Sequence, residues 1–421
     1  GISSGALATD VWTNNTPSDV EVVYTLVPVG DNGCKGNSFT VTVTVNPEPV
    51  VANQPVEVCS DEPLGINFGS SSSVAATSYE ITALTLNGLT VSAGGASEVG
   101  GLSASDLSDD AFTNITAFPV DVVYTVVPFT SANCEGNSFT VTVTVNPEPV
   151  VEDQITDVCS DEALGYTISG DVDTPLVATY NLTSIVSTGL VGASGNQVVA
   201  DGISSGALAT DVWTNNTPSN VEVVYTLVPV GDNGCEGDPF TVTVTVNPEP
   251  VVANQTTEAC SDESLGYTIS GDVDTPLVAT YNLTSIVSTG LVGASGNQVV
   301  ADGISSGALA TDVWTNNTPS DVEVVYTLVP VGDNGCKGNS FTVTVTVNPE
   351  PVVEDQITDV CSDEALGYTI SGDVDTPLVA TYNLTSIVST GLVGASGNQV
   401  VADGISSGAL ATDVWTNNTP S

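Results

Sequence analysis

The stretch Phe39–Val45, FTVTVTV, alternates strictly between an apolar residue, phenylalanine or valine, and threonine. Alternation with a period of two predicts a strand that has one buried face and one exposed face. The run Val20–Val29, VEVVYTLVPV, predicts a second strand before it, and Gly30–Gly33, GDNG, supplies the turn residues between the two. Asn46–Pro49, NPEP, ends the later strand because proline cannot donate to a ladder. These residues therefore predict an antiparallel hairpin followed by a joint.

The hairpin belongs to a repeat. The segment CSDE recurs with a period of 100 or 101 residues, and the opening run GISSGALATDVWTNNTP recurs three more times. A unit of about 100 residues matches one sandwich domain rather than one turn of a solenoid. The chain starts inside one repeat and stops inside another, so we expect a window from a longer array. CSDE begins at Cys59, Cys159, Cys260 and Cys361.

If the NPEP segments are joints, they divide the chain into three whole repeats and two partial ones. The expected units are a partial repeat at 1–47, a diverged repeat at 48–147, repeats at 148–248 and 249–349, and a partial repeat at 350–421. Within 148–248, further strands are expected at Leu164–Ser169, Thr179–Val186 and Gly195–Ala200. No stretch has sustained helical periodicity. The predicted fold is all-β, with tandem Ig-like Greek-key β-sandwich domains arranged as an elongated rod.

Charge excludes several classes of partner. The chain has 50 acidic residues, two basic ones (Lys35 and Lys337) and no histidine, for a net charge of −48. Nucleic acid and anionic membrane surfaces both require clustered lysine and arginine. No membrane-spanning segment is found in this window. With 41% hydrophobic residues, many of them β-branched, the chain is expected to be folded rather than disordered.

Catalysis is not expected. Without histidine, a Ser–His–Asp or Cys–His arrangement is impossible. The paired carboxylates lie in repeated turns, whereas a glycoside hydrolase needs one unique cleft. The recurring tryptophan, replaced by Phe112 in the diverged repeat, is interpreted as a core residue rather than a sugar platform. N-x-T sequons are expected to mark surface loops, at Asn14, Asn114, Asn181, Asn215, Asn282, Asn316, Asn383 and Asn417.

The cysteines indicate an oxidising, extracellular environment. Eight cysteines occur at fixed positions, two per repeat, and no histidine accompanies them, so disulfides are favoured over thiolate metal sites. One cysteine of each repeat follows the first strand. The other lies in the turn of the last hairpin. In the whole repeats the candidates are Cys59, Cys134, Cys159, Cys235, Cys260 and Cys336.

Three pairings are open. The two turns of one sandwich lie at opposite ends, about 25–30 Å apart for strands of eight to ten residues, whereas a disulfide needs Cα atoms within about 7 Å. This favours head-to-tail bonds between neighbouring domains, Cys59–Cys235 and Cys159–Cys336. The alternatives are an intradomain bond of the type Cys59–Cys134, and a bond between Cys235 and Cys260 if the joint were itself a hairpin.

The end-to-end arrangement of the domains is also expected to bring carboxylates together at the joints. Oxygen ligands on flexible loops suit Ca²⁺, which takes six to eight of them. We therefore expect calcium at the joint between the second and third whole repeats, although a solvated acidic surface is the alternative. No other cofactor is expected. The candidate ligands are Asp161, Glu162, Glu249, Asp272, Asp274 and Asp333.

The hairpin also carries a family resemblance. VVYTLVP, NGC and FTVTVTVNPEP, followed by VCSDE, recur in this order. This pattern resembles the PKD-like and Ig-like repeats of giant secreted proteins of the Bacteroidota. The resemblance implies export by type IX secretion and a role in a cell-surface adhesin linked to gliding or attachment.

Two functional classes follow, with a third that is weaker. The first is the structural stalk of an extracellular adhesin, which holds a binding tip away from the cell and bears load. The second is a self-assembling fibre of Ig-like repeats, and the third is carbohydrate binding by the repeats themselves. The expected partners are adjacent repeats of the same chain, other copies in a fibre, and a surface glycan or protein ligand at a tip outside this window.

Overall fold

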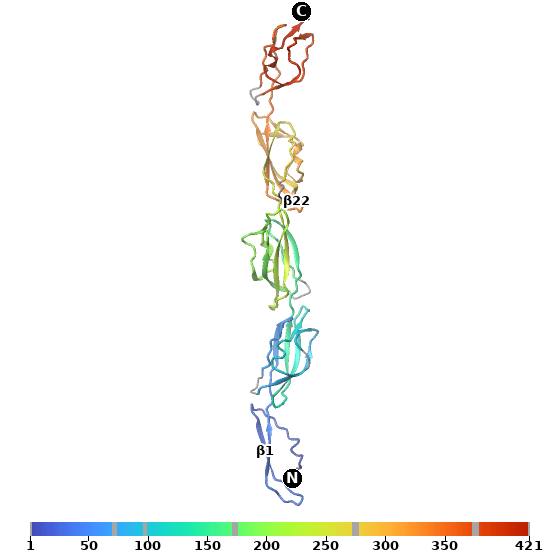
Figure 1. Ribbon diagram of the computed structural model, residues 1–421, viewed down its shortest axis with the longest axis vertical. Helices are drawn as coiled ribbons and strands as arrows, with labels where there is room; N and C mark the ends of the chain where they lie inside the picture. Colours follow the sequence, from blue (N-terminus) through green and yellow to red (C-terminus); the bar gives the residue numbers. More distant parts are fainter. Residues whose placement is uncertain are drawn as a thin grey trace.

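The protein is a rod of β-sandwich domains that follow one another in a line (Figure 1), seen in a computed structural model. The structure describes residues 2–69, 74–95, 99–170, 176–271, 278–372 and 379–419. We refer to residues 48–147, 148–248 and 249–349 as domains 1, 2 and 3. An N-terminal unit and a C-terminal unit flank them, and the two chain ends lie at opposite ends of the rod.

Each of the three domains contains a five-stranded sheet and a two-stranded sheet. In domain 2 the five-stranded sheet has the order β10-β16-β15-β11-β13, and β12 pairs with β14. The order is the same in domain 1 (β3-β9-β8-β4-β6, with β5-β7) and in domain 3 (β17-β23-β22-β18-β20, with β19-β21). This arrangement confirms the predicted fold class.

The strand bounds repeat from domain to domain. Domain 1 has β3 (Gln54–Cys59), β4 (Ser78–Thr85), β5 (Thr90–Ala93), β6 (Gly100–Leu102), β7 (Ala111–Thr113), β8 (Val120–Phe129) and β9 (Phe139–Asn146). Domain 2 has β10 (Gln154–Cys159), β11 (Val177–Val186), β12 (Val191–Gly192), β13 (Ala200–Ile203), β14 (Trp213–Thr214), β15 (Val221–Gly231) and β16 (Phe240–Asn247). Domain 3 has β17 (Gln255–Cys260), β18 (Val278–Val287), β19 (Leu291–Gly293), β20 (Ala301–Ile304), β21 (Trp314–Asn316), β22 (Val322–Gly332) and β23 (Phe341–Asn348).

The remaining elements are short. The N-terminal unit has β1 (Val20–Leu26) and β2 (Phe39–Val45), and the C-terminal unit has β24 (Tyr382–Leu384), β25 (Leu392–Gly394), β26 (Ala402–Ile405) and β27 (Trp415–Asn417). Three 3-10 turns, η1 (Ala207–Thr210), η2 (Ala308–Thr311) and η3 (Ala409–Thr412), precede the tryptophan strands.

The predicted hairpin forms in every unit that contains it. In domain 2, β15 and β16 are antiparallel, with Val221 opposite Val246 and Leu227 opposite Phe240. Every second residue of β16 is buried, and the Val242 and Val244 side chains have no exposed surface. The alternation of FTVTVTV therefore reports burial of one face, as the sequence predicts.

The first strand of each domain completes the sheet from the other side of the hairpin. β10 pairs with β16 in parallel, from Gln154 opposite Val242 to Cys159 opposite Asn247. The chain therefore enters a domain and leaves it on two adjacent strands that point in the same direction.

Two strand predictions were wrong. Leu164–Ser169 is not a strand. Its amides instead bond the segment around η1, with Leu164 N–H donating to Asp211 and Ile168 N–H to Ser205. Gly195–Ala200 is mostly irregular, with a turn residue and bends, and β13 begins only at Ala200. LGYTIS alternates in character as a strand would, but its backbone partners lie outside a ladder, whereas Gly195–Ala200, GNQVVA, does not alternate.

In domains 2 and 3 the recurring tryptophan lies in the core, as predicted. Trp213 Nε1–H donates to the Tyr225 hydroxyl at 2.7 Å, and that hydroxyl donates to Asp211 Oδ2 at 2.8 Å. Tyr225 and Asp211 are completely buried. Burial raises the pKa of Tyr225 and, despite its hydrogen bonds, that of Asp211. The Trp–Tyr–Asp group thus joins the loop after η1 to the centre of the sheet.

The sequon before each hairpin is also part of the core, which corrects its interpretation as a surface loop. Asn215 is only 6% exposed. Its side-chain amide donates to the backbone oxygens of Ser219 at 2.9 Å and Val246 at 2.8 Å, and its carbonyl accepts from Thr217. Asn114 and Asn316 are buried in the same arrangement. We call this group the asparagine clasp.

Candidate functional site at the domain joints

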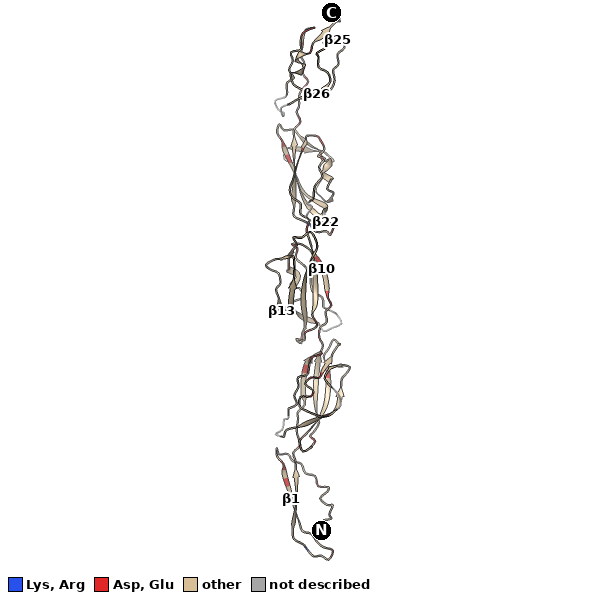
Figure 2. Cartoon of the chain, in the orientation of Figure 1, with Lys and Arg blue, Asp and Glu red and all other residues tan. Residues whose placement is uncertain are grey.

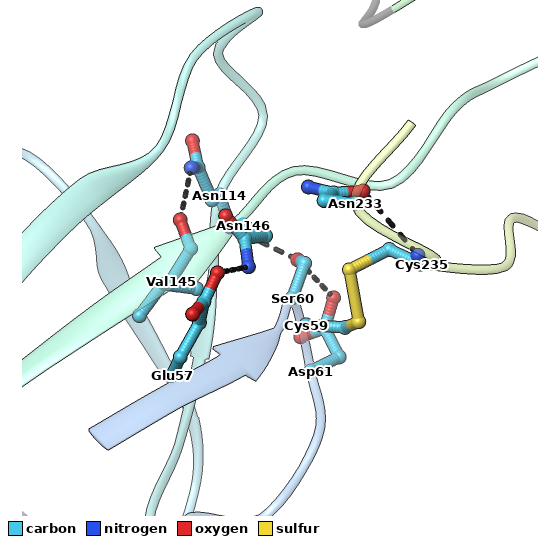
Figure 3. Close-up of a disulfide and its surroundings, with 9 residues drawn as sticks. All are labelled: Glu57, Cys59, Ser60, Asp61, Asn114, Val145, Asn146, Asn233 and Cys235. Carbon is cyan, nitrogen blue, oxygen red and sulfur yellow. Dashed lines mark hydrogen bonds between the residues drawn. A yellow bond between two sulfur atoms is a disulfide. The ribbon is translucent and has the colours of Figure 1, made fainter. Parts of the chain in front are cut away.

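Two disulfides connect neighbouring domains. Cys59, the last residue of β3 in domain 1, is bonded to Cys235, in the turn between β15 and β16 of domain 2 (Figure 3). Their Cα atoms are 5.6 Å apart. Cys159 of domain 2 is bonded to Cys336 of domain 3 with a Cα separation of 5.5 Å. These are the two bonds that the end-to-end argument favoured over the intradomain and hairpin pairings, and we call them staples.

The remaining cysteines are free, including Cys134 and Cys260, which were expected in disulfides. A staple joins cysteines that are 176 or 177 residues apart. The sequence holds no cysteine at that distance from Cys134 or Cys260 in the required direction, and the same is true of Cys34 and Cys361. These four thiols therefore have no partner at the spacing of a staple within this sequence.

Hydrogen bonds hold each staple cysteine in place. Ser60 N–H, directly after Cys59, donates to Asn146 O of β9 at 2.8 Å. Across the joint, the side-chain oxygen of Asn233 accepts from Cys235 N–H at 3.3 Å (Figure 3). The hairpin turn needs Gly234 because its φ is +82°. Each cysteine is therefore presented by a turn that its own sheet anchors.

The aspartate of CSDE stabilises the turn. Asp161 has a φ of 60°, and its carboxylate accepts hydrogen bonds from the Thr214 and Ser160 hydroxyls. Burial acts to raise the pKa of the equivalent Asp61, but hydrogen bonds from Thr113, Ser92 and Ser60 outweigh it and lower that pKa overall. At the first joint, Asp61 therefore anchors the turn that carries the staple as a carboxylate.

The linker glutamate lies among carboxylates from the domain before it. Burial raises the pKa of Glu249 to about 7, and the charges of Asp161 and Glu162 add to the effect. Glu148 has the same environment at the first joint, where burial, Asp61 and Asp238 raise its pKa to about 7. A hollow of about 420 Å³ lies there, bounded by both domains at Cys59, Pro63, Glu148 and Gly234, among others.

The structure thus brings three of the predicted calcium ligands, Asp161, Glu162 and Glu249, within electrostatic range of one another. Asp333 lies in the turn that precedes Cys336. Asp272 and Asp274 lie outside the described residues. Among the residues that are described, no group of three or more His, Cys, Asp or Glu side chains could hold a metal ion. Calcium at the joint stays a prediction.

The prolines of NPEP contribute a close contact that sequence reasoning missed. A Cβ atom placed on Gly237 would lie 1.8 Å from the Pro149 carbonyl oxygen, and one placed on Gly338 would lie 1.8 Å from that of Pro250. Only glycine allows the linker to lie against the hairpin in this way. The signal was present in the sequence, because a glycine follows two residues after each hairpin cysteine.

The repeats match one family model. The model of the PKD-like domain matches residues 1–49, 56–149, 156–250 and 257–351. The chain belongs to the PKD-like domain family. No curated protein matches the PKD-like chain.

Solved structures match most of the chain, but with low scores. Drosophila N-cadherin EC1-4 covers 80% of this chain over 85% of its own length, at 12% identity and a TM-score of 0.18. Domains FN1-FN3 of chicken CNTN1 cover 71% over 99% of theirs, at 8% identity and a TM-score of 0.21. These scores are too low to carry an argument about function.

The disulfides bear on where the PKD-like chain is found. Disulfides persist in oxidising environments, so the two staples indicate an extracellular or secreted protein. In the described part of the chain, none of the helices has the length and apolar character needed to cross a membrane.

Proposed function

We propose that these PKD-like repeats form the structural stalk of a long extracellular surface adhesin, and that the stalk projects a binding tip and bears mechanical load. The observation that carries the proposal is the covalent closure of both complete joints between domains arranged in a line (Figure 1). A bond across a joint limits the separation of two neighbouring domains, which is a requirement of a spacer and not of a binding pocket.

Charge supports this role. Acidic residues occur along the whole rod (Figure 2), and the net charge of −48 should keep neighbouring rods apart and soluble. Repetition of nearly identical domains multiplies length rather than any unique surface. We therefore also propose that the repeats are not catalytic and that the ligand-binding part belongs to the tip. The resemblance to giant secreted proteins of the Bacteroidota suggests type IX secretion and a link to gliding or attachment.

Labelling of intact cells tests the proposal. Antibody raised against residues 148–349 should label the surface of cells that produce the protein, without permeabilisation. Electron microscopy of the purified chain should show single thin rods of constant length. Labelling that requires permeabilised cells, or compact particles in place of rods, would contradict the stalk.

A fibre is the second candidate, because one apolar feature repeats with the domains. Val198 and Val199 are 70% and 60% exposed, and their counterparts Val299 and Val300 are 71% and 61% exposed. Such a regular series of exposed valines could support lateral association. Sedimentation of the chain at increasing salt separates the candidates: a stalk stays monomeric when its charge is screened, whereas a fibre assembles.

A further inference from the structure

The staples connect segments that are already extended. Cys235–Cys260 comprises 26 residues that leave the hairpin turn of domain 2, form β16, cross the joint and form β17 of domain 3. After Cys235, no residue up to 260 lies in a turn or a bend, and all of them are described. Cys34–Cys59, Cys134–Cys159 and Cys336–Cys361 have the same course. Each such segment passes through two successive units as a single extended stretch.

The staples join these segments into two continuous covalent lines. Cys59–Cys235 connects Cys34–Cys59 to Cys235–Cys260, which we call the first cable. Cys159–Cys336 connects Cys134–Cys159 to Cys336–Cys361, which we call the second cable. The first cable crosses four successive units on one strand per unit. The second does so in domains 1 to 3 and then continues through residues 349–361, which form no strand. The second cable is displaced along the rod by one domain.

The two cables lie side by side inside every domain. In domain 2 the second cable supplies β10 and the first supplies β16, and these strands pair in parallel over six residues each. The same pairing joins β3 to β9 in domain 1 and β17 to β23 in domain 3. The rest of each sandwich, such as residues 160–234 of domain 2, lies outside both cables.

The contour lengths of the cable and of the whole backbone set how far tension can extend the rod. From Cys34 to Cys260 the backbone has 227 residues, but the first cable has only 52. At a maximum of about 3.3–3.6 Å per residue, 52 residues reach roughly 170–190 Å and 227 residues roughly 750–820 Å. Four folded units of about 30–40 Å each occupy roughly 120–160 Å. The folded rod is therefore already close to the limit that the cable sets.

We propose that the staples make the rod inextensible: tension passes along the two cables, and the remainder of each sandwich is shielded from stretching even if it unfolds. Tandem sandwiches without staples lengthen several-fold when their domains unfold under load. The inference deepens and rests on the load-bearing role proposed above, for which it supplies the mechanism.

Single-molecule stretching between Cys34 and Cys260 tests the proposal, because both thiols are free for thioether handles. Cys134→Ser and Cys361→Ser remove the other free thiols. The oxidised chain should reach no more than roughly 190 Å of protein contour. After reduction the same molecule should reach roughly 750 Å or more, about a fourfold increase.

Matched variants separate the two cables. Cys59→Ser with Cys235→Ser should give the long contour without any reductant, whereas Cys159→Ser with Cys336→Ser should leave the short contour unchanged between these handles. In this Cys134→Ser background, intradomain pairing would leave Cys159–Cys235 and a 152-residue path of roughly 500–550 Å, which would overturn the inference. An oxidised chain that stretches well beyond roughly 190 Å would overturn it as well. Neither result depends on cell-surface labelling, which tests the stalk separately.

Discussion

Domains 2 and 3 are the same sandwich in different covalent surroundings. Cys159 ends β10 and is bonded to the next domain, whereas Cys260 ends β17 and is free. Nevertheless the two strands pair with their neighbours in the same register, from Gln154 opposite Val242 and from Gln255 opposite Val343. The staple therefore does not shape the sandwich. It acts between sandwiches.

The substitutions with the largest expected effect test whether the two domains have the same intrinsic stability. Trp213→Ala and Trp314→Ala each remove an indole that is 6% exposed and hydrogen-bonded to a buried tyrosine. Each should cost about 3–5 kcal/mol in the domain that carries it. Hydrogen exchange read by mass spectrometry measures both domains in one molecule. A clear difference between the two losses would break the equivalence of the domains.

Removal of the second staple should have the next largest effect. Cys159→Ser with Cys336→Ser should lower the free energy of unfolding of domains 2 and 3 by about 2–4 kcal/mol, because the unfolded chain gains freedom. Urea denaturation followed by hydrogen exchange measures the loss. Cys260→Ser is the matched control and should change little, since Cys260 is free. Equal effects in both variants would show that the staple adds nothing beyond the cysteine side chain.

A change of pH should have a smaller effect on the stability of the second joint. The pKa of Glu249 is raised to about 7 in the folded protein from 4.5, so the folded state binds the proton more tightly. The stability of the joint should therefore fall as pH rises from about 4.5 to 7 and stay low above that range. Glu249→Gln should raise the melting temperature at pH 8 and have little effect at pH 5. Asp302→Asn, an exposed acid of domain 3, is the control and should change neither.

Calcium should give the smallest effect. If the ion binds at the joint of domains 2 and 3, its addition stabilises the folded state by about 1 kcal/mol at concentrations several-fold above its Kd. Calorimetry should then show a melting temperature that falls after chelation, and Glu249→Gln should abolish the response. A melting temperature that chelation leaves unchanged would rule out structural calcium at this joint.

Much of this architecture could be predicted from local sequence. The hairpin followed from FTVTVTV, and the position of the cysteines at opposite ends of the domain followed from strand length. Leu164–Ser169 could not be placed, because alternation also fits an extended segment that bonds a 3-10 turn. The buried Asp211 was missed because an aspartate usually indicates an exposed position, and only its recurrence 14 residues before each core tyrosine pointed to a partner.

The asparagine clasp has a consequence for producing this protein. Both N–H bonds of the Asn215 amide are used inside the domain, and that amide nitrogen is the atom to which an N-glycan is attached. A eukaryotic secretory pathway that modified the nascent chain would remove one donor and place a sugar where the loop must close against Val246. Bacterial hosts with an oxidising export route avoid this conflict, because they can form the disulfides without modifying the sequons.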